Sequence, residues 1–172
     1  MTRTVFRYIL HFIILTIIQL FVLDNLFLFD LIHPYIYFAF ILMLPVNMNR
    51  YVFISIALVY GFVIDILSFT YGLHTSTLVV IGFLRPYMMR LFVSEEQIEQ
   101  NVEVHFTTIG ARRYLIYLLI MLFIHHSLLN ILQVFSFREY FFTLYKTVLN
   151  IIASLLIIVV YDLTFFVKPK SN

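Results

Sequence analysis

Long apolar stretches alternate with short polar breaks along the whole chain. A helix needs about 20 mostly apolar residues to cross the hydrocarbon core of a bilayer, and most of these stretches come close to that length. Leu, Ile, Phe and Val fill them without the alternation typical of barrel strands, which favours helices. The pattern predicts an all-α integral membrane protein, a single six-transmembrane-helix bundle over residues 1–172, with spans at 8–23, 31–44, 51–69, 74–92, 114–134 and 143–167.

The second stretch, residues 31–44, is the least regular of the six. It is short for a span, His33 and Pro34 lie near its start, and Pro45 lies just beyond its end. Proline lacks a backbone N–H and biases the preceding residue away from helix. The stretch therefore fits either a short span or a half-buried segment, and an even number of spans favours a crossing.

The basic residues in the polar breaks predict the orientation of the chain. Cytoplasmic loops of membrane proteins carry an excess of Lys and Arg. Alternate breaks on one side contain Arg138 alone, whereas those on the other side contain Arg3, Arg7, Arg50, Arg90, Arg112, Arg113, Lys168 and Lys170. Both termini and the polar loop at residues 94–113 are therefore expected on the cytoplasmic side of the membrane.

Composition excludes a soluble domain. Of the 172 residues 63% are hydrophobic and 12% are charged, and the mean hydropathy is +1.01, so polar side chains cannot cover a water-exposed surface. Tyrosines near the span ends, Tyr37 and Tyr114 among them, are expected to form the interfacial belt. The chain has no cysteine, which excludes disulfides, thiolate metal sites and cysteine nucleophiles.

No soluble catalytic signature, such as G-x-S-x-G or H-E-x-x-H, occurs in the chain, and its longest polar stretch is too short for a catalytic domain. We therefore expect no catalytic residue, no metal and no cofactor. A lipid-modifying membrane enzyme stays open as an alternative, because Asp24, Asp30, His33 and Asp65 all lie near the predicted outer face.

Polar residues at membrane depth are costly and are therefore candidate functional residues. Asp65 lies one helical turn after Gly61, and His74 begins the next span after a tight turn at Tyr71 and Gly72. We expect Asp65 and His74 to be neighbours, with the carboxylate beside the imidazole. The pair could bind a partner or a small ligand, or it could simply hold the hairpin together.

Arg85 and Pro86 form the least expected pair within a span. Pro86 cannot donate a hydrogen bond to the preceding turn, so a kink with free carbonyl groups is expected beside the guanidinium. Asp162, in the sixth span, lies at a comparable depth and is the expected ion-pair partner of Arg85. Alternatively, Arg85 extends to the interface from a structural bend.

Two adjacent histidines, His125 and His126, lie in the middle of the fifth span. Neighbouring residues on a helix point about 100° apart, and no carboxylate is near them in sequence, so a metal site is not expected. Hydrogen bonds to Gln19 or Asn150 on other helices are the expected role.

Several of these residues belong to a recognisable succession of motifs. The chain reads G-F-V-I-D at 61–65, Y-G-L-H-T at 71–75 and F-L-R-P at 83–86, together with H-P-Y-I-Y at 33–37, L-P at 44–45 and H-H at 125–126. In motif order, length and number of spans it resembles the rod shape-determining protein MreD family. The specific part of the resemblance is the G-x-x-x-D, G-L-H and R-P succession.

The resemblance implies a non-enzymatic subunit of the bacterial cell-elongation machinery, which directs peptidoglycan synthesis and cell shape. It implies a fold similar to the substrate-binding subunits of energy-coupling-factor transporters and a location in the bacterial inner membrane. The implied partners are the single-span protein MreC, the filament protein MreB and, in the wider complex, RodA and the elongation transpeptidase.

The fold similarity supplies the alternative function, a membrane subunit that binds a vitamin or another micronutrient for a transporter. Such subunits often carry A-x-x-x-A on the first span, where small residues allow close helix contact. The four alanines of this chain are Ala39, Ala57, Ala111 and Ala153, and none lies in the first predicted span. This absence favours the elongation-machinery subunit over the transporter subunit.

Overall fold

A computed structural model describes residues 2–25, 32–134 and 140–166 of the chain. Within these ranges the regular secondary structure is helical, Pro45 and Glu103 form an isolated bridge, and the connecting segments are irregular. The helices, in chain order, are α1 (Thr2–Ile17), continued by the π-helix η1 (Ile18–Leu23), then α2 (Phe38–Met43), α3 (Arg50–Ser68), α4 (Leu73–Phe92), α5 (Glu95–Glu99), α6 (Phe106–Ile109), α7 (Ala111–Val134) and α8 (Tyr140–Phe166).

The structure confirms an all-α, membrane-embedded protein. Among the described residues, 4 segments are long and apolar enough to cross a membrane, and they lie in α1 with η1, in α3, in α7 and in α8. Helix α4 has 20 residues, but Arg85 and Arg90 make it less apolar. Six spans are therefore not established by length and composition.

The second predicted span is not a regular helix. Of residues 31–44, Leu31 lies outside the described residues and only Phe38–Met43 forms a helix, α2. Pro34 explains part of this difference, because proline disfavours helix both at its own position and at His33. The segment before α2 is irregular and lies partly or wholly buried inside the bundle.

Polar side chains from neighbouring helices satisfy the backbone of this irregular segment. The N–H groups of His33, Tyr35 and Ile36 each donate a 2.8 Å hydrogen bond, to Asn150, Ser154 and Gln19 respectively. A buried N–H group without a partner is costly, so these side chains take the place of helical hydrogen bonds.

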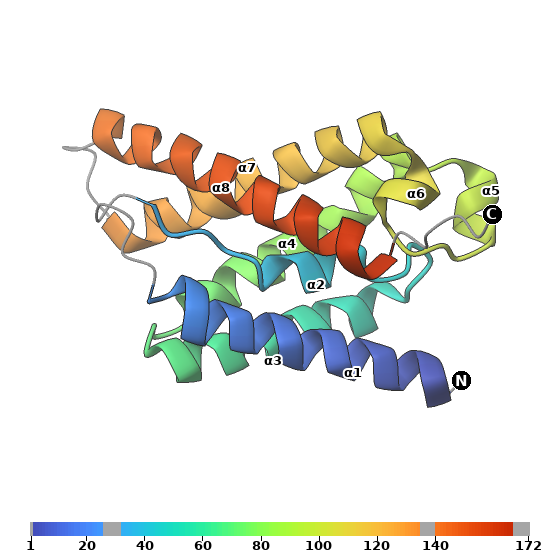
Figure 1. Cartoon of the computed structure of the whole chain (residues 1–172), viewed down its shortest axis with the longest axis horizontal. Helices are drawn as coiled ribbons and strands as arrows, with labels where there is room; N and C mark the ends of the chain where they lie inside the picture. The colour runs from blue at the N-terminus through green and yellow to red at the C-terminus, as the bar shows by residue number, and fades with distance from the viewer. Residues whose placement is uncertain (1, 26–31, 135–139, 167–172) are drawn as a thin grey trace.

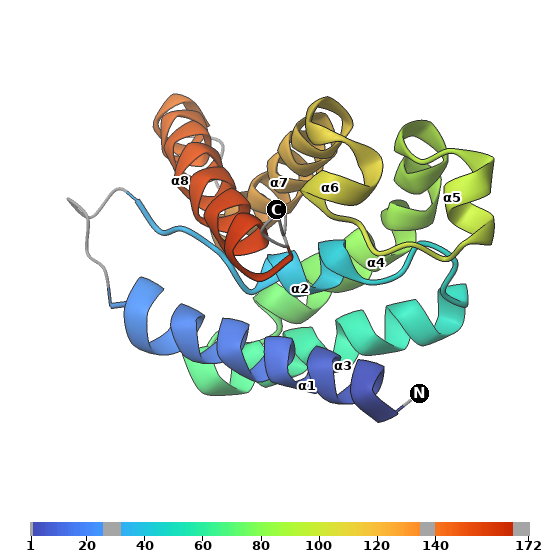
Figure 2. The same cartoon turned by 45° about the vertical axis from the view of Figure 1, so that its right-hand side comes forward.

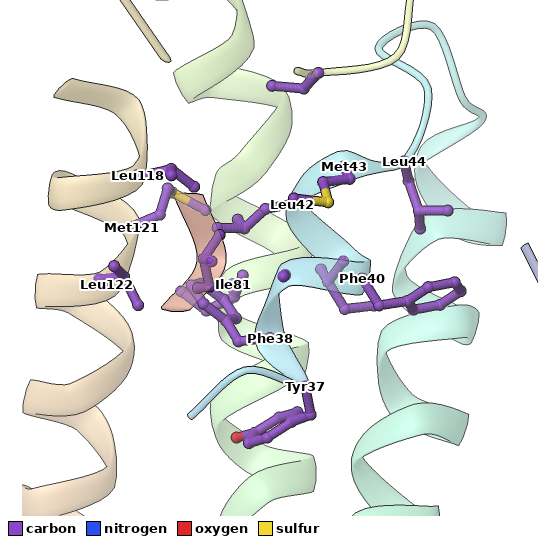
Figure 3. Packing of buried hydrophobic residues seen from close by; sticks show 14 of the residues in the cluster. Tyr37, Phe38, Phe40, Leu42, Met43, Leu44, Ile81, Leu118, Met121 and Leu122 are labelled. Carbon is purple, nitrogen blue, oxygen red and sulfur yellow. The ribbon is translucent and has the colours of Figure 1, made fainter. Parts of the chain in front are cut away.

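Helix α2 lies in the centre of the molecule (Figure 1). All six of its residues are buried. In Figure 3, Phe38 and Leu42 point toward α4 and α7, whereas Phe40 points toward α3. The turned view in Figure 2 shows α1 and α3 on one side of α2 and α7 and α8 on the other. The short helix therefore joins the two halves of the bundle.

Two polar layers mark opposite ends of the bundle. At one end, the Glu103 side chain bonds to Arg7 near the start of α1, and Asp162 near the end of α8 bonds to His105. At the other end, Ser68 donates to Asp24, which follows η1. The start of α1 and the end of α8 therefore lie at the same end of the bundle (Figure 1).

Candidate functional site

The most buried polar cluster, which we call the central cluster, consists of Tyr37, His74 and His125. The Tyr37 hydroxyl lies 2.8 Å from Nδ1 of His74 and 2.7 Å from Nε2 of His125. Tyr37 and His125 are fully buried and His74 is 5% exposed. The cluster connects the segment before α2 to α4 and α7, and no charged side chain takes part in its hydrogen bonds.

The positions of the protons in this cluster follow from one unpaired atom. Nδ1 of His125 is buried and has no hydrogen-bond partner among the residues that the structure describes. A buried N–H without an acceptor costs more than a bare ring nitrogen, so we assign the proton of His125 to Nε2, which donates to the Tyr37 oxygen. The Tyr37 hydroxyl then donates to His74. The result is a one-way chain from α7 through Tyr37 to α4.

His126 serves a separate, structural role beside the central cluster. Its Nδ1 lies 2.9 Å from the carbonyl oxygen of Leu122, and its Nε2 lies 3.2 Å from Oγ of Ser154. The expectation that His125 and His126 would bond to Gln19 or Asn150 is wrong. Those two amides are occupied by the irregular backbone around Pro34.

Asp65 caps the start of α4. Its carboxylate accepts hydrogen bonds from the N–H groups of His74, at 3.0 Å, and Thr75, at 2.8 Å, and from the hydroxyl groups of Thr70 and Thr75. The first N–H groups of a helix have no partner within the helix. A carboxylate at this end accepts their hydrogen bonds, and its negative charge interacts favourably with the positive end of the helix dipole. Asp65 and His74 are neighbours, as expected, but the hydrogen bond between them joins the carboxylate to the backbone N–H of His74, while Nδ1 of the imidazole bonds to Tyr37.

Two glycines allow this hairpin to form. A Cβ atom on Gly61 would lie 2.5 Å from Cα of Thr75, so only glycine permits α3 and α4 to come so close. Gly72 has φ +91°, a conformation that glycine adopts without strain, and it precedes the first residue of α4. Gly61, Asp65 and Gly72 therefore determine how α3 and α4 pack.

Arg85 holds the C-terminal end of α2. It is 2% exposed, and its guanidinium donates to the carbonyl oxygens of Leu42 (3.1 Å), Leu44 and Pro45 (3.2 Å). Its Cζ also lies 4.7 Å from the ring centre of Phe53. A cation at the end of a helix compensates the unpaired carbonyl groups and the helix dipole. Arg85 is thus a buried cap.

The expected ion pair between Arg85 and Asp162 is wrong. Asp162 accepts from His105 Nδ1, at 2.8 Å, and from the N–H of Phe106, at 2.9 Å, and both donors belong to the polar loop. Equal depth along two helices does not place two side chains on facing sides. Helix α4 remains helical through Pro86, and the carbonyl groups that Arg85 contacts belong to the last turn of α2 and the two residues that follow it, Leu44 and Pro45.

Asp162 belongs to a second cluster, which we call the loop clasp and which comprises Arg7, Glu103, His105 and Asp162. Glu103 accepts from Arg7 and Tyr8, and its other oxygen lies 3.1 Å from His105 Nε2. The loop clasp ties α1, the polar loop and α8 together. Sequence reasoning did not single out Glu103 or His105, although a histidine two residues after a glutamate in a membrane-adjacent loop is a usable signal.

In the loop clasp, the pKa values of His105 and Glu103 are shifted toward their charged forms. Burial by itself lowers the pKa of His105, but hydrogen bonds to Asp162 and Glu103 outweigh it and raise that pKa above the usual 6.5. Burial by itself raises the pKa of Glu103, whereas hydrogen bonds from His105 and Tyr8 and the charge of Arg7 lower it below the usual 4.5. The clasp therefore favours the cationic form of His105 and the anionic form of Glu103.

Sequence reasoning also missed the central position of Tyr37. Tyr37 and Tyr114 were expected in the interfacial belt, and both are fully buried. A tyrosine near the end of an apolar stretch is typical of the interface, but the irregular segment carries Tyr37 into the core. The His33-Pro34 dipeptide, which disfavours a regular helix, is the sequence feature that could have predicted the irregular segment.

Two hollows differ in size and chemistry. One, next to His11 and His105, has a volume of about 10 Å³, which is about the room one water molecule needs. The other has a volume of about 810 Å³ and lies between α1 and α3, with almost entirely apolar walls. Within the described part of the chain, no group of three or more His, Asp or Glu side chains could hold a metal ion.

Comparison of the chain with protein-family models, with curated proteins and with solved structures finds no match.

Proposed function

We propose that this protein is a non-enzymatic scaffold subunit of the bacterial cell-elongation machinery, of the MreD type, and that it binds the single-span protein MreC. MreB, RodA and the elongation transpeptidase belong to the wider complex in this proposal. The protein would reside in the bacterial inner membrane with both termini in the cytoplasm.

The observation that carries the proposal is what the motif residues do. Gly61 and Asp65 join α3 to α4, Gly72 forms the turn between them, and Arg85 holds α2. Each of the three motifs in the succession that resembles the MreD family therefore contributes at least one residue to the packing of the helices. A scaffold needs a rigid surface to present to its partners, and these contacts provide rigidity.

The interior polar groups also favour a scaffold over an enzyme or a transporter subunit. Ligand sites are usually hollows of about 300–1,000 Å³ with a few convergent polar groups. Here Tyr37, His74 and His125 bond to one another, and Arg85 bonds to backbone carbonyl groups. The hollow of 810 Å³ is of sufficient size, but Ser55 and tyrosine hydroxyls are the polar groups of its walls.

The proposal includes six crossings, arranged as in the substrate-binding subunits of energy-coupling-factor transporters. The contacts of Arg7 and Asp162 with the polar loop support it, because they bring the start of α1, residues 103–105 and the end of α8 to one end of the bundle. An even number of crossings requires that arrangement. In this scheme the segment at residues 32–44 crosses inside the protein, shielded from lipid.

Co-purification tests the proposed function. The tagged full-length chain is co-expressed with MreC of the same organism, extracted in detergent and passed over a sizing column, with an unrelated single-span protein as the control. We expect MreC and not the control to elute with the chain. Elution of the chain without MreC, or with a tightly held small molecule, would contradict the proposal.

A further inference from the structure

One side of α4 is exposed along most of the helix. The exposed side chains, which we call the α4 stripe, are Val80, Phe83, Tyr87, Arg90 and Leu91. Positions 80, 83, 87 and 91 recur at intervals of three and four residues, which places them on one side of the helix, and Arg90 follows Tyr87 by three. The stripe is apolar at Val80 and Phe83 and becomes polar toward the end of the helix.

Arg50, the first residue of α3, reaches across to the α4 stripe. Its Cζ lies 5.0 Å from the ring centre of Phe83, whose ring centre lies 5.8 Å from that of Tyr87. A guanidinium group over an aromatic face is attracted by the negative potential of the ring. Phe83 therefore holds the charge of Arg50 against the stripe, while the Arg50 side chain stays exposed.

The two arginines lie at the same end of the α3–α4 hairpin. Gly61 lies against Thr75 near the start of α4, whereas Gly82, further along α4, lies beside Ala57, nearer the start of α3. The helices are therefore antiparallel, and the first residue of α3 meets the second half of α4 (Figure 2). Arg90 belongs to the last turn of α4. It lies about 10 Å beyond Phe83 along the helix axis, with Tyr87 between them.

Neither arginine has an anionic partner in the part of the chain that the structure describes. The ion pairs found there all belong to the loop clasp. Glu95, Glu96 and Glu99 follow α4 closely, in α5, but none of them pairs with Arg50 or Arg90. A charge beside the hydrocarbon core is costly without a counter-ion. An anion from outside the chain would therefore be stabilised between the two arginines.

The surroundings of the arginines favour an anion that carries an apolar tail. A phosphate group accepts paired hydrogen bonds from a guanidinium group, and tyrosine is typical of the level of the lipid headgroups. Below Tyr87 the α4 stripe continues with Phe83 and Val80, which can contact an acyl chain but offer nothing to a free inorganic anion. A phospholipid matches both parts of this surface.

We infer that the start of α3 and the end of α4 form a binding site for an anionic phospholipid, whose phosphate is bound by Arg50 and Arg90. Arg112 and Arg113, at the start of α7, are also exposed. Within the described ranges, however, neither lies over an aromatic ring, so the aromatic contact of Arg50 distinguishes the site from a general excess of positive charge. The inference requires only that the bundle lies in a membrane and is independent of the proposed function.

Tryptophan fluorescence tests the inference in the full-length chain, which contains no natural tryptophan. Leu91→Trp places a reporter in the α4 stripe, and Leu115→Trp places a control beside Arg112 and Arg113. Each variant is reconstituted into vesicles of phosphatidylcholine and phosphatidylglycerol, with one of the two lipids brominated as a quencher. At position 91 we expect phosphatidylglycerol to be preferred about tenfold, because two arginines face its charge, and at position 115 we expect a weaker preference.

Substitutions in the Leu91→Trp background test the role of Arg50. Arg50→Gln should lower the preference for phosphatidylglycerol about fivefold, the contribution of one arginine near anionic lipid. Arg113→Gln is the matched control, because it removes the same charge at the same end of the bundle, and it should leave the preference unchanged. Phe83→Leu keeps the apolar surface but removes the ring, so it should lower the preference in part. Each variant must elute as monodisperse protein before reconstitution.

Three outcomes would overturn the inference. The first is equal quenching by the two brominated lipids at position 91. The second is a preference that Arg50→Gln and Arg113→Gln lower alike, since this would show a general attraction of positive charge to the membrane surface. The third is loss of the preference when inorganic phosphate is added to the vesicles, since this would show a site for a free anion.

Discussion

At the scale of single residues, several buried polar side chains of this protein bond to backbone groups. Arg85 donates to three carbonyl groups at the end of α2, and Asp65 accepts from two N–H groups at the start of α4. In the hydrocarbon core of a membrane, an unpaired backbone group cannot form a hydrogen bond to water. A side chain that forms a hydrogen bond with that group therefore contributes directly to stability. These residues act as helix caps.

Replacing Arg85 should destabilise the protein by an amount that depends on the donors removed. Arg85→Ala removes the guanidinium donors from the carbonyl groups of Leu42, Leu44 and Pro45, of which Leu42 keeps a long bond from the Tyr117 hydroxyl. The change should cost about 3 kcal/mol, whereas Arg85→Lys keeps a charge without the planar fork and should cost about half as much. Thermal unfolding of the detergent-solubilised protein measures both. Equal stability of all three proteins would show that the cap contributes nothing.

The double variant of Arg85 and Asp162 tests the corrected pairing. Because the two side chains share no hydrogen-bond partner, the costs of Arg85→Ala and Asp162→Asn should add to within about 0.5 kcal/mol. Thermal unfolding of the two single variants and the double variant gives the comparison. Partial rescue in the double variant would mean that the two side chains interact after all.

At the scale of elements, the close contact between α3 and α4 depends on one glycine. Gly61→Ala places a methyl group against the backbone of Thr75, so the helices must separate, at a cost of about 1–3 kcal/mol. Gly82→Ala is the matched control, because its Cβ would lie 3.2 Å from the Ala57 side chain and no closer than 3.6 Å to the nearest backbone atom, Cα of Ile54. We expect a clear loss of thermal stability for the first variant and a smaller change for the second.

The loop clasp should make stability depend on pH. The folded-state pKa of His105 is raised, so its contribution is complete below about pH 6.5 and is lost as the pH rises through the folded value. The folded-state pKa of Glu103 is lowered, so its contribution is complete above about pH 4.5 and is lost on acidification. Stability due to the clasp is therefore greatest between these two values.

His105→Asn isolates the alkaline side of this dependence. In the unmodified protein, the unfolding temperature in detergent should fall as the pH is raised from about 6 to about 9. The variant should be less stable at pH 6 but should lose less on the same rise in pH. A parallel decline in both proteins would assign the effect to other groups.

At the scale of the whole molecule, the ends of the bundle should face opposite sides of the membrane. The chain contains no cysteine, so single cysteines report position without background. Cysteine in place of Glu99, in α5, and in place of Tyr71, in the turn before α4, should be labelled by an impermeant reagent from opposite sides. Labelling of both from one side would rule out the proposed topology.

Hydropathy by itself determined that this is a helical membrane protein. A span is recognised from about 20 consecutive residues, and the solvation of each segment is a local property, so α1, α3, α7 and α8 agree with predicted spans. The proximity of Asp65 and His74 was also predictable from local sequence, because they are nine residues apart and joined by one tight turn.

Tertiary structure alone decided which distant polar groups meet. Arg85 bonds to Pro45, 40 residues earlier, and the N–H of His33 bonds to Asn150, 117 residues later. Such pairs depend on the rotation of each helix about its axis and on which helix packs beside it. Similar depth in the bilayer determines neither the rotation nor the neighbour. The same packing carries the segment at residues 32–37 through the core in irregular form, because Gln19, Asn150 and Ser154 supply the hydrogen bonds that a helix would otherwise have made within itself.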